Sequence, residues 1–245
     1  MIRVTEICRL ASQPLDKLVS EARLGRPPAN EAMLQGTAWH ALILRDNRDS
    51  ADIPSEIVLI DSDNYRTKSA QELKAQALAE NKVPMLAKDY KVARESIDFL
   101  ASALNQIFPA GAQYEAKLQG RADYFSEIVG HTDCIAGDKI IDLKISTKGG
   151  DFNKLIFDSA YQLQVYLYMH LSSKTSAEIV FINPDSLTIT RKTLDYYTIQ
   201  SEADSLLKLA HQKQKLVAEA TQHALIQTSD YATPQWAYAN LMQGE

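Results

Sequence analysis

Apolar positions recur at helical spacing through most of the first 110 residues. A first helix is expected within residues 1–25, with its apolar face at Leu10, Leu15, Leu18 and Val19, and it should end at Gly25 before two prolines. Further elements are expected at about 30–44 (helix), 56–60 (strand), 69–81 (helix) and 88–107 (helix), with Pro84 and Pro109 as breaks. This part of the chain therefore reads as mainly helical.

From Gln113 the pattern changes to the alternation that is typical of strands. Strands are expected near 113–119, 122–129, 131–136 and 139–145, then a helix over 157–171, strands near 177–182 and 187–192, and a helix over 200–221. This order predicts an α/β fold with a central mixed sheet flanked by helices and an N-terminal helical elaboration.

One domain is expected for 245 residues. Its expected parts are a helical part (about 1–110), a sheet core (111–195) and a C-terminal helix with an arm (196–245); the arm, from Thr228 on, would pack on its own domain or on a neighbouring subunit. With 26 basic and 31 acidic residues the net charge is −5, which argues against coating DNA by bulk electrostatics. Any contact with DNA would therefore have to be local.

Two cysteines are too few for a disulfide framework, and no apolar run is long enough to span a membrane. Reduced thiols and a cytoplasmic setting are the expectation.

Candidate chemistry lies in the segment Ile140–Ser146. Side chains of a strand alternate between faces, so Asp142 and Lys144 project together while the aliphatic residues between them project the other way. Asp133 lies one expected strand earlier, and a hairpin would bring the two carboxylates close. Two carboxylates suit Mg²⁺ or Mn²⁺. The alternative is a solvated hairpin with charged tips.

The next helix carries Gln-x-x-x-Tyr in two overlapping frames, Gln162 with Tyr166 and Gln164 with Tyr168. Residues four apart share a helix face, but the two frames lie about 200° apart, so only one pair can face a site. We expect Gln162 and Tyr166 to face it. The alternative is an amphipathic helix with partly buried tyrosines.

Four ordered motifs resemble the PD-(D/E)XK nuclease superfamily in its RecB-type branch. They are Gly36-x-x-x-His40, Gly130-His131-Thr132-Asp133, Asp142-Leu143-Lys144 and Gln162-x-x-x-Tyr166. The stretch from Met33 to Leu44 further resembles the phage and prophage exonuclease VIII group, which is related in function to lambda exonuclease. Thr132 stands where the superfamily has its name-giving proline. Branches of the superfamily with an iron–sulfur cluster need four cysteines, and this chain has two, so it does not belong to those branches.

The resemblance implies a Mg²⁺ site, with Mn²⁺ as a substitute and without a nucleotide cofactor. Its implied ligands are Asp133, Asp142, His40, the backbone carbonyl of Leu143 and, less directly, Glu115. Lys144 would orient or deprotonate the attacking water, and Gln162 and Tyr166 would position their helix against the site. Taken alone, His40 reads as a core histidine and Glu115 as an exposed strand carboxylate.

The resemblance also implies a substrate and partners. The expected activity is 5′ to 3′ degradation of linear double-stranded DNA from its ends for single-strand annealing recombination, by a ring-shaped trimer or tetramer that works with an annealing protein. A terminal 5′ phosphate calls for arginine; the candidates are Arg9, Arg23, Arg26 and Arg121.

Two alternatives stay open from the sequence. One is a RecB-type endonuclease or the nuclease subunit of a larger repair complex; the chain carries no phosphate loop and hence no recognisable ATPase of its own. The other is a catalytically inactive subunit for DNA binding or assembly.

Overall fold

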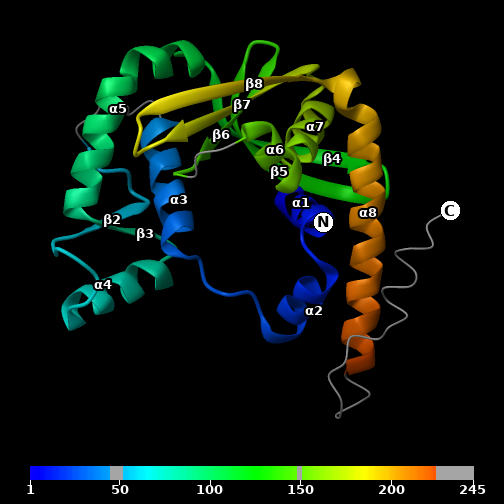
Figure 1. Cartoon of the computed structure of the whole chain (residues 1–245), viewed down its shortest axis with the longest axis horizontal. Helices are drawn as coiled ribbons and strands as arrows, with labels where there is room; N and C mark the ends of the chain where they lie inside the picture. The colour runs from blue at the N-terminus through cyan, green and yellow to red at the C-terminus, as the bar shows by residue number, and fades with distance from the viewer. Residues whose placement is uncertain (45–51, 148–150, 225–245) are drawn as a thin grey trace.

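A mixed six-stranded sheet forms the centre of the computed structural model, which describes residues 1–44, 52–147 and 151–224 (Figure 1). Parallel pairs join β1 to β5 and β6 to β7, and antiparallel pairs join β4 to β5, β5 to β6 and β7 to β8. The strands are β1 (Ile2–Arg3), β4 (Gln113–Ala122), β5 (Phe125–Ala136), β6 (Lys139–Ile145), β7 (Ser176–Asn183) and β8 (Thr188–Asp195).

Helices cover both faces of this sheet. The helices of the described ranges are α1 (Val4–Ser12), α2 (Leu15–Leu24), α3 (Glu31–Ile43), α4 (Lys68–Ala79), α5 (Ala87–Ile107), α6 (Phe152–Asp158), α7 (Tyr161–Ser172) and α8 (Tyr196–Ala224). One hydrophobic core joins the sheet to α1, α7 and α8, and a second joins it to α3 and α5. The second core also includes residues of a separate parallel pair, β2 (Ile57–Ile60) with β3 (Val83–Leu86). The predicted fold class, a central mixed sheet flanked by helices, is confirmed.

Helix α7 is buried on nearly every side. Eight consecutive residues, 162–169, are buried, because the helix lies between the sheet and α8 (Figure 1). A helix that is apolar all round is one that packs inside a domain. Its polar side chains must therefore find hydrogen-bond partners within the protein, and these partners show which neighbour each side chain faces.

Several predicted boundaries are wrong. Pro14 divides the first helix into α1 and α2, the two strands predicted over 122–136 are the single strand β5, and the helix predicted over 157–171 is divided at Ala160, whose φ is 53°. Strand β3 was not predicted because Pro84 reads as a break; a proline is tolerated in a two-stranded sheet, where each strand has a free edge. The predicted arm lies outside the described residues.

One edge of β5 is shared by two strands. Strand β4 pairs with β5 along its whole length, so β6, at Cys134–Ala136, and β1, at Ile128–Val129, must both lie on the other edge. Residues 130–133 lie between these two pairings. A Cβ atom on Gly130 would lie 2.7 Å from Tyr168 Cε1 and 2.9 Å from Val4 Cγ2, so α1 and α7 close tightly over this gap. The gap ends at Asp133.

Among the helices of the described ranges, none combines the length and the apolar character that crossing a bilayer requires.

Candidate active site

Asp133 and Asp142 lie where β5 and β6 separate. The antiparallel ladder pairs Cys134 with Ile141, so the next pair in register would be Asp133 with Asp142. The ladder stops there, and Asp133 Oδ2 instead accepts a hydrogen bond of 2.7 Å from the backbone N–H of Leu143. Because both carboxylates are anchored on strands at this split, their positions are fixed by the sheet itself.

Asp142 and Lys144 share one face of β6, as the alternation predicts. Ile141 and Leu143 belong to the core with α3 and α5, which places the charged pair on the side of α1 and α7. Lys144 Nζ lies 2.6 Å from Asp142 Oδ2, and the two side chains are 16% and 1% exposed. Their contact is an ion pair, and the Oδ2 atom of Asp142 is buried.

The two carboxylates have unequal affinities for protons. Burial and the neighbouring charge of Asp133 raise the pKa of Asp142, even though Lys144 opposes the shift. Burial acts on Asp133 in the same sense, but His40, Lys144 and the N–H of Leu143 together hold the pKa of Asp133 below its ordinary value. A further positive charge between them would favour the ionised form of both.

Lys144 is held as an ammonium group. Burial lowers its pKa, but the charges of Asp142 and Asp133 outweigh this and raise the pKa of Lys144 above its ordinary value. Its Nζ also lies 4.7 Å from the centre of the Tyr161 ring, within the range of a cation–π contact. Tyr161 begins α7, so the helix contacts the charged pair through this ring. Tyr161 was not among the site residues predicted from the sequence.

His40 approaches the pair from α3, with Nδ1 3.5 Å from Asp133 Oδ1. The neighbouring Trp39, Leu42 and Ile43 are buried in the core, which fixes the side of α3 that His40 occupies. Glu115 lies on β4 between residues paired with Thr132 and Cys134, and hence across from Asp133, but it is exposed and its φ is 49°. Its role as a ligand stays a prediction.

The predicted frame of the Gln-x-x-x-Tyr motif is wrong. Gln162 Nε2 donates to Glu202, and the Tyr166 hydroxyl donates to Asp204, each at 3.4 Å, so this pair faces α8. The other pair, Gln164 and Tyr168, faces the sheet: Gln164 Nε2 donates to the Tyr168 hydroxyl at 3.0 Å.

Tyr168 lies near the charged pair. Burial and the negative charge of Asp142 raise the pKa of Tyr168, and the ring lies against Gly130. Tyr161, Gln164 and Tyr168 are spaced i, i+3, i+7 and so lie on one face of α7. Nothing in the sequence marks this face, because residues 162–169 are buried on every side.

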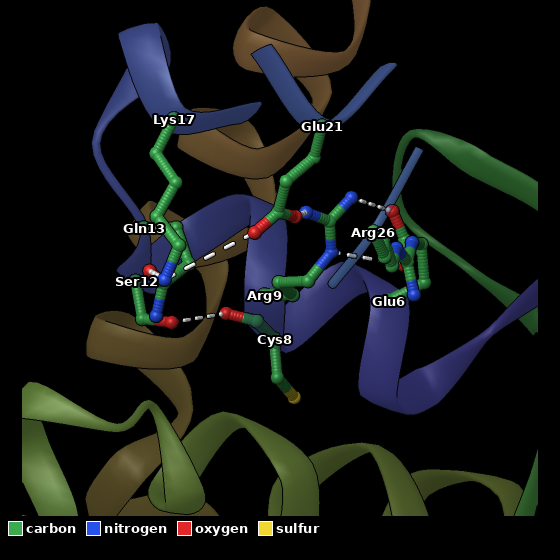
Figure 2. Close-up of polar contacts among 8 residues, drawn as sticks. All are labelled: Glu6, Cys8, Arg9, Ser12, Gln13, Lys17, Glu21 and Arg26. Atoms are coloured by element: carbon green, nitrogen blue, oxygen red, sulfur yellow. Dashed lines mark hydrogen bonds and ion pairs between the residues drawn. The ribbon is translucent and has the colours of Figure 1, made fainter. Parts of the chain in front are cut away.

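Helix α1 closes the site from a third side. Burial, with the charge of Asp142, raises the pKa of Cys8 to about 12, so Cys8 is a neutral thiol beside the charged pair. Figure 2 shows Cys8 pointing away from its neighbour Arg9, whose guanidinium extends toward Glu6 and Glu21. The helix therefore presents a neutral face to the candidate site and a charged face away from it.

Three of the four arginines predicted to bind phosphate already have acceptors. Arg9 binds Glu6 and Glu21, and Arg26 binds Glu6 (Figure 2). Arg23 Nη2 donates to the carbonyl of Ala220 on α8 at 2.9 Å. Arg121 is exposed near the end of β4. The phosphate-binding role of all four stays a prediction.

Neither the family models nor the curated protein sequences match the chain. A provisionally named exonuclease from Eubacterium rectale shares the fold: TM-score 0.53, 13% identity, 100% of this chain and 93% of that chain. A phage-related exonuclease from Haemophilus somnus matches with TM-score 0.37 and 15% identity over 74% and 94% of the two chains. LHK-Exo from Laribacter hongkongensis, solved with dAMP, matches with TM-score 0.41 and 11% identity over 91% and 93%.

Proposed function

We propose that this protein is a Mg²⁺-dependent DNA exonuclease of the PD-(D/E)XK superfamily. The observation that carries the proposal is the cluster of Asp133, Asp142 and Lys144 at the point where β5 and β6 separate. The four ordered motifs of the sequence support it, and so does the fold shared with the provisionally named exonuclease from Eubacterium rectale.

The donor set of the cluster fits a divalent metal ion. Asp142 Oδ2 is buried against the ammonium of Lys144, and Asp133 Oδ1 is engaged only by a long contact with His40 among its described partners. No three His, Cys, Asp or Glu side chains of the described residues converge as a ready-made metal cluster. Mg²⁺ does not require one, because it commonly binds one or two carboxylates together with waters and substrate phosphate.

Asp133 and Asp142 would hold the metal ion, with His40, the carbonyl of Leu143 and Glu115 as further ligands. A bound Mg²⁺ supplies a polarised phosphate and a more acidic water. The ammonium of Lys144 lies at the same place and would stabilise negative charge that develops on the phosphate. Because its carboxylate neighbours favour the charged form, orienting the water and stabilising charge fit Lys144 better than acting as a base.

Helix α7 would bound the site on the substrate side. Tyr161 packs against Lys144 and so restrains the ammonium, while Gln164 and Tyr168 form a hydrogen-bonded pair beside the carboxylates. These contacts would keep the reacting groups in one geometry, which matters because a misplacement of about 1 Å can cost roughly a hundredfold in rate. Gln162 and Tyr166 would act indirectly, by fixing α7 against α8.

The finer proposal is degradation of linear double-stranded DNA in the 5′ to 3′ direction during single-strand annealing recombination. It rests on the resemblance to the exonuclease VIII group, which also suggests a ring-shaped trimer or tetramer and an annealing protein as partner. For Arg9, Arg23 or Arg26, binding a 5′ phosphate would require exchange of the present acceptor for the phosphate.

The test is digestion of linear duplex, labelled at the 5′ or the 3′ end, beside covalently closed circular DNA in Mg²⁺. We expect loss of the linear form only, with early release of the 5′ label. Lys144→Met should abolish it, and Lys154→Met on α6, a matched lysine outside the cluster, should not. Cutting of the circle would favour the endonuclease, and no cleavage in Mg²⁺ or Mn²⁺ would favour an inactive subunit.

A further inference from the structure

Two exposed tyrosines stand at the ends of a groove along α8. Tyr197, in the first turn of the helix, is 71% exposed, and Tyr124, in the turn between β4 and β5, is 51% exposed. The groove has a volume of about 480 Å³, and α8 lines it with Gln200, Ser201, Asp204, Ser205 and Lys208. Tyr197 and Lys208 are 11 positions apart, which corresponds to about 16 Å of helix.

Both rings are supported from beneath. The ring of Tyr124 stacks on His211, one turn beyond Lys208, with centroids 5.5 Å apart and planes 29° apart. The ring of Tyr197 meets Tyr196 edge to face at 5.4 Å and 86°. Each tyrosine is thus held in place while much of its surface is open, and a ring fixed before binding loses little entropy when a ligand stacks on it.

Charge contributes little to this groove. Lys208 and Asp204 oppose each other, and Asp204 accepts a hydrogen bond from Tyr166. The remaining lining groups are an amide and two hydroxyls. A ligand for this groove therefore carries flat rings for the tyrosines and polar edges for the neutral groups. Nucleobases have both properties, and only a single strand leaves their faces open to a protein ring.

We propose that this groove binds single-stranded DNA, with bases stacked on Tyr124 and Tyr197. The assignment rests on the proposed function, since an exonuclease that degrades one strand of a duplex leaves the other single. At the roughly 3.4 Å rise of a stacked strand, 16 Å spans four to five nucleotides.

Helix α7 connects the groove to the candidate active site. One face of α7 presents Tyr168 to the charged pair, and the other presents Tyr166 to Asp204 in the groove. A helix with its side chains is about 10–12 Å across, so the groove lies about one helix diameter behind the site. A strand that leaves the site can reach the groove within a few nucleotides.

The test is the binding of a fluorescein-labelled 12-nucleotide oligothymidine, followed by fluorescence anisotropy in EDTA so that hydrolysis is blocked. We expect Tyr124→Ala and Tyr197→Ala each to raise the Kd at least about fivefold, the lower end of what one stacked base contributes. Tyr197→Phe should bind as the wild type does. Phe99→Ala is the matched control, because Phe99 is 73% exposed and belongs to α5. Helices α5 and α8 lie on opposite sides of the molecule (Figure 1).

Equal binding by both alanine variants and the wild type would overturn the proposal, as would displacement of the oligonucleotide by a proline-rich peptide at lower concentration. The fold increase in Kd caused by each alanine substitution should be similar at 50 and 200 mM NaCl, because the tyrosines contribute stacking and not phosphate contacts. An increase in Kd that vanishes at 200 mM NaCl would contradict the proposal. Digestion of linear duplex is measured separately. If the wild type does not digest duplex DNA but the alanine variants bind oligothymidine more weakly as expected, only the proposed function is refuted. If the wild type digests duplex DNA but the alanine variants bind as tightly as it does, only the proposed groove is refuted.

Discussion

The two glutamines of α7 offer a matched pair of perturbations. Gln164 and Gln162 are both buried, both donate one side-chain hydrogen bond, and lie two positions apart on the same helix. Gln164 faces the candidate site and Gln162 faces α8. Replacing each in turn by leucine, which has a similar volume, changes one face of the helix at a time.

The magnitude follows from what each substitution leaves behind. Gln164→Leu leaves the hydroxyl of Tyr168 buried without its 3.0 Å partner, and a buried polar group without a partner costs about 1–3 kcal/mol. Tyr168→Phe should cost a similar amount, because it strands the Gln164 amide. The double variant removes both groups, so it should be more stable than the sum of the two single losses predicts. Gln162→Leu breaks only a 3.4 Å contact to Glu202, which is exposed and can turn to water.

Urea unfolding gives the stability of each variant, and the initial rate of duplex digestion gives its activity. We expect Gln164→Leu to lose at least about tenfold in rate, equivalent to roughly 1.4 kcal/mol of transition-state stabilisation, because Tyr168 is released beside the carboxylates. Gln162→Leu should lose less than about threefold. A rate lowered by Gln162→Leu and unchanged by Gln164→Leu would refute the assignment of the two faces.

Two further substitutions test the framework around the site. Gly130→Ala should destabilise the protein by about 1–3 kcal/mol in urea unfolding and lower the digestion rate, because the added Cβ meets Tyr168 at 2.7 Å; a neutral effect would contradict this close packing. Glu178 accepts from Arg191 at 3.0 Å and from Lys139 at 3.1 Å across three strands, so its pKa is lowered despite burial. A carboxyl group whose pKa is lowered in the folded protein stabilises the fold at pH values above its ordinary pKa. This stabilisation is lost as the pH falls through the pKa of the folded state. Glu178→Gln should therefore cost about 1 kcal/mol at pH 7, discounted because both partners are partly exposed, and less below about pH 4; a loss independent of pH would contradict it.

The sequence predicted the charged hairpin well because its signals are local. Alternation along β6 places Asp142 and Lys144 on one face without knowledge of the rest of the fold, and the short turn after Ala136 brings Asp133 across from them. The order of helices and strands was sufficient for the fold class for the same reason. Each of these inferences depends on residues that are close in sequence.

The face of α7 could not be predicted in this way. Residues 162–169 are buried all round, so the hydrophobic pattern shows no preferred side, and the choice between Gln162 and Gln164 depends on where α8 packs. Helix α8 begins 30 residues after Tyr166. The gap in β5 is equally non-local, since it depends on β1 pairing with a strand more than 100 residues away. Such contacts are set by tertiary packing.

The catalytic role of Asp142 is tested by the release of nucleotides from linear duplex DNA by Asp142→Asn and by the wild type, in Mg²⁺ and in EDTA. The substitution keeps the size of the side chain and removes its charge. We expect the wild type to degrade the duplex only in Mg²⁺ and Asp142→Asn to lose at least about a hundredfold in rate while remaining folded. Wild-type activity in EDTA, or an undiminished rate for Asp142→Asn, would contradict this expectation.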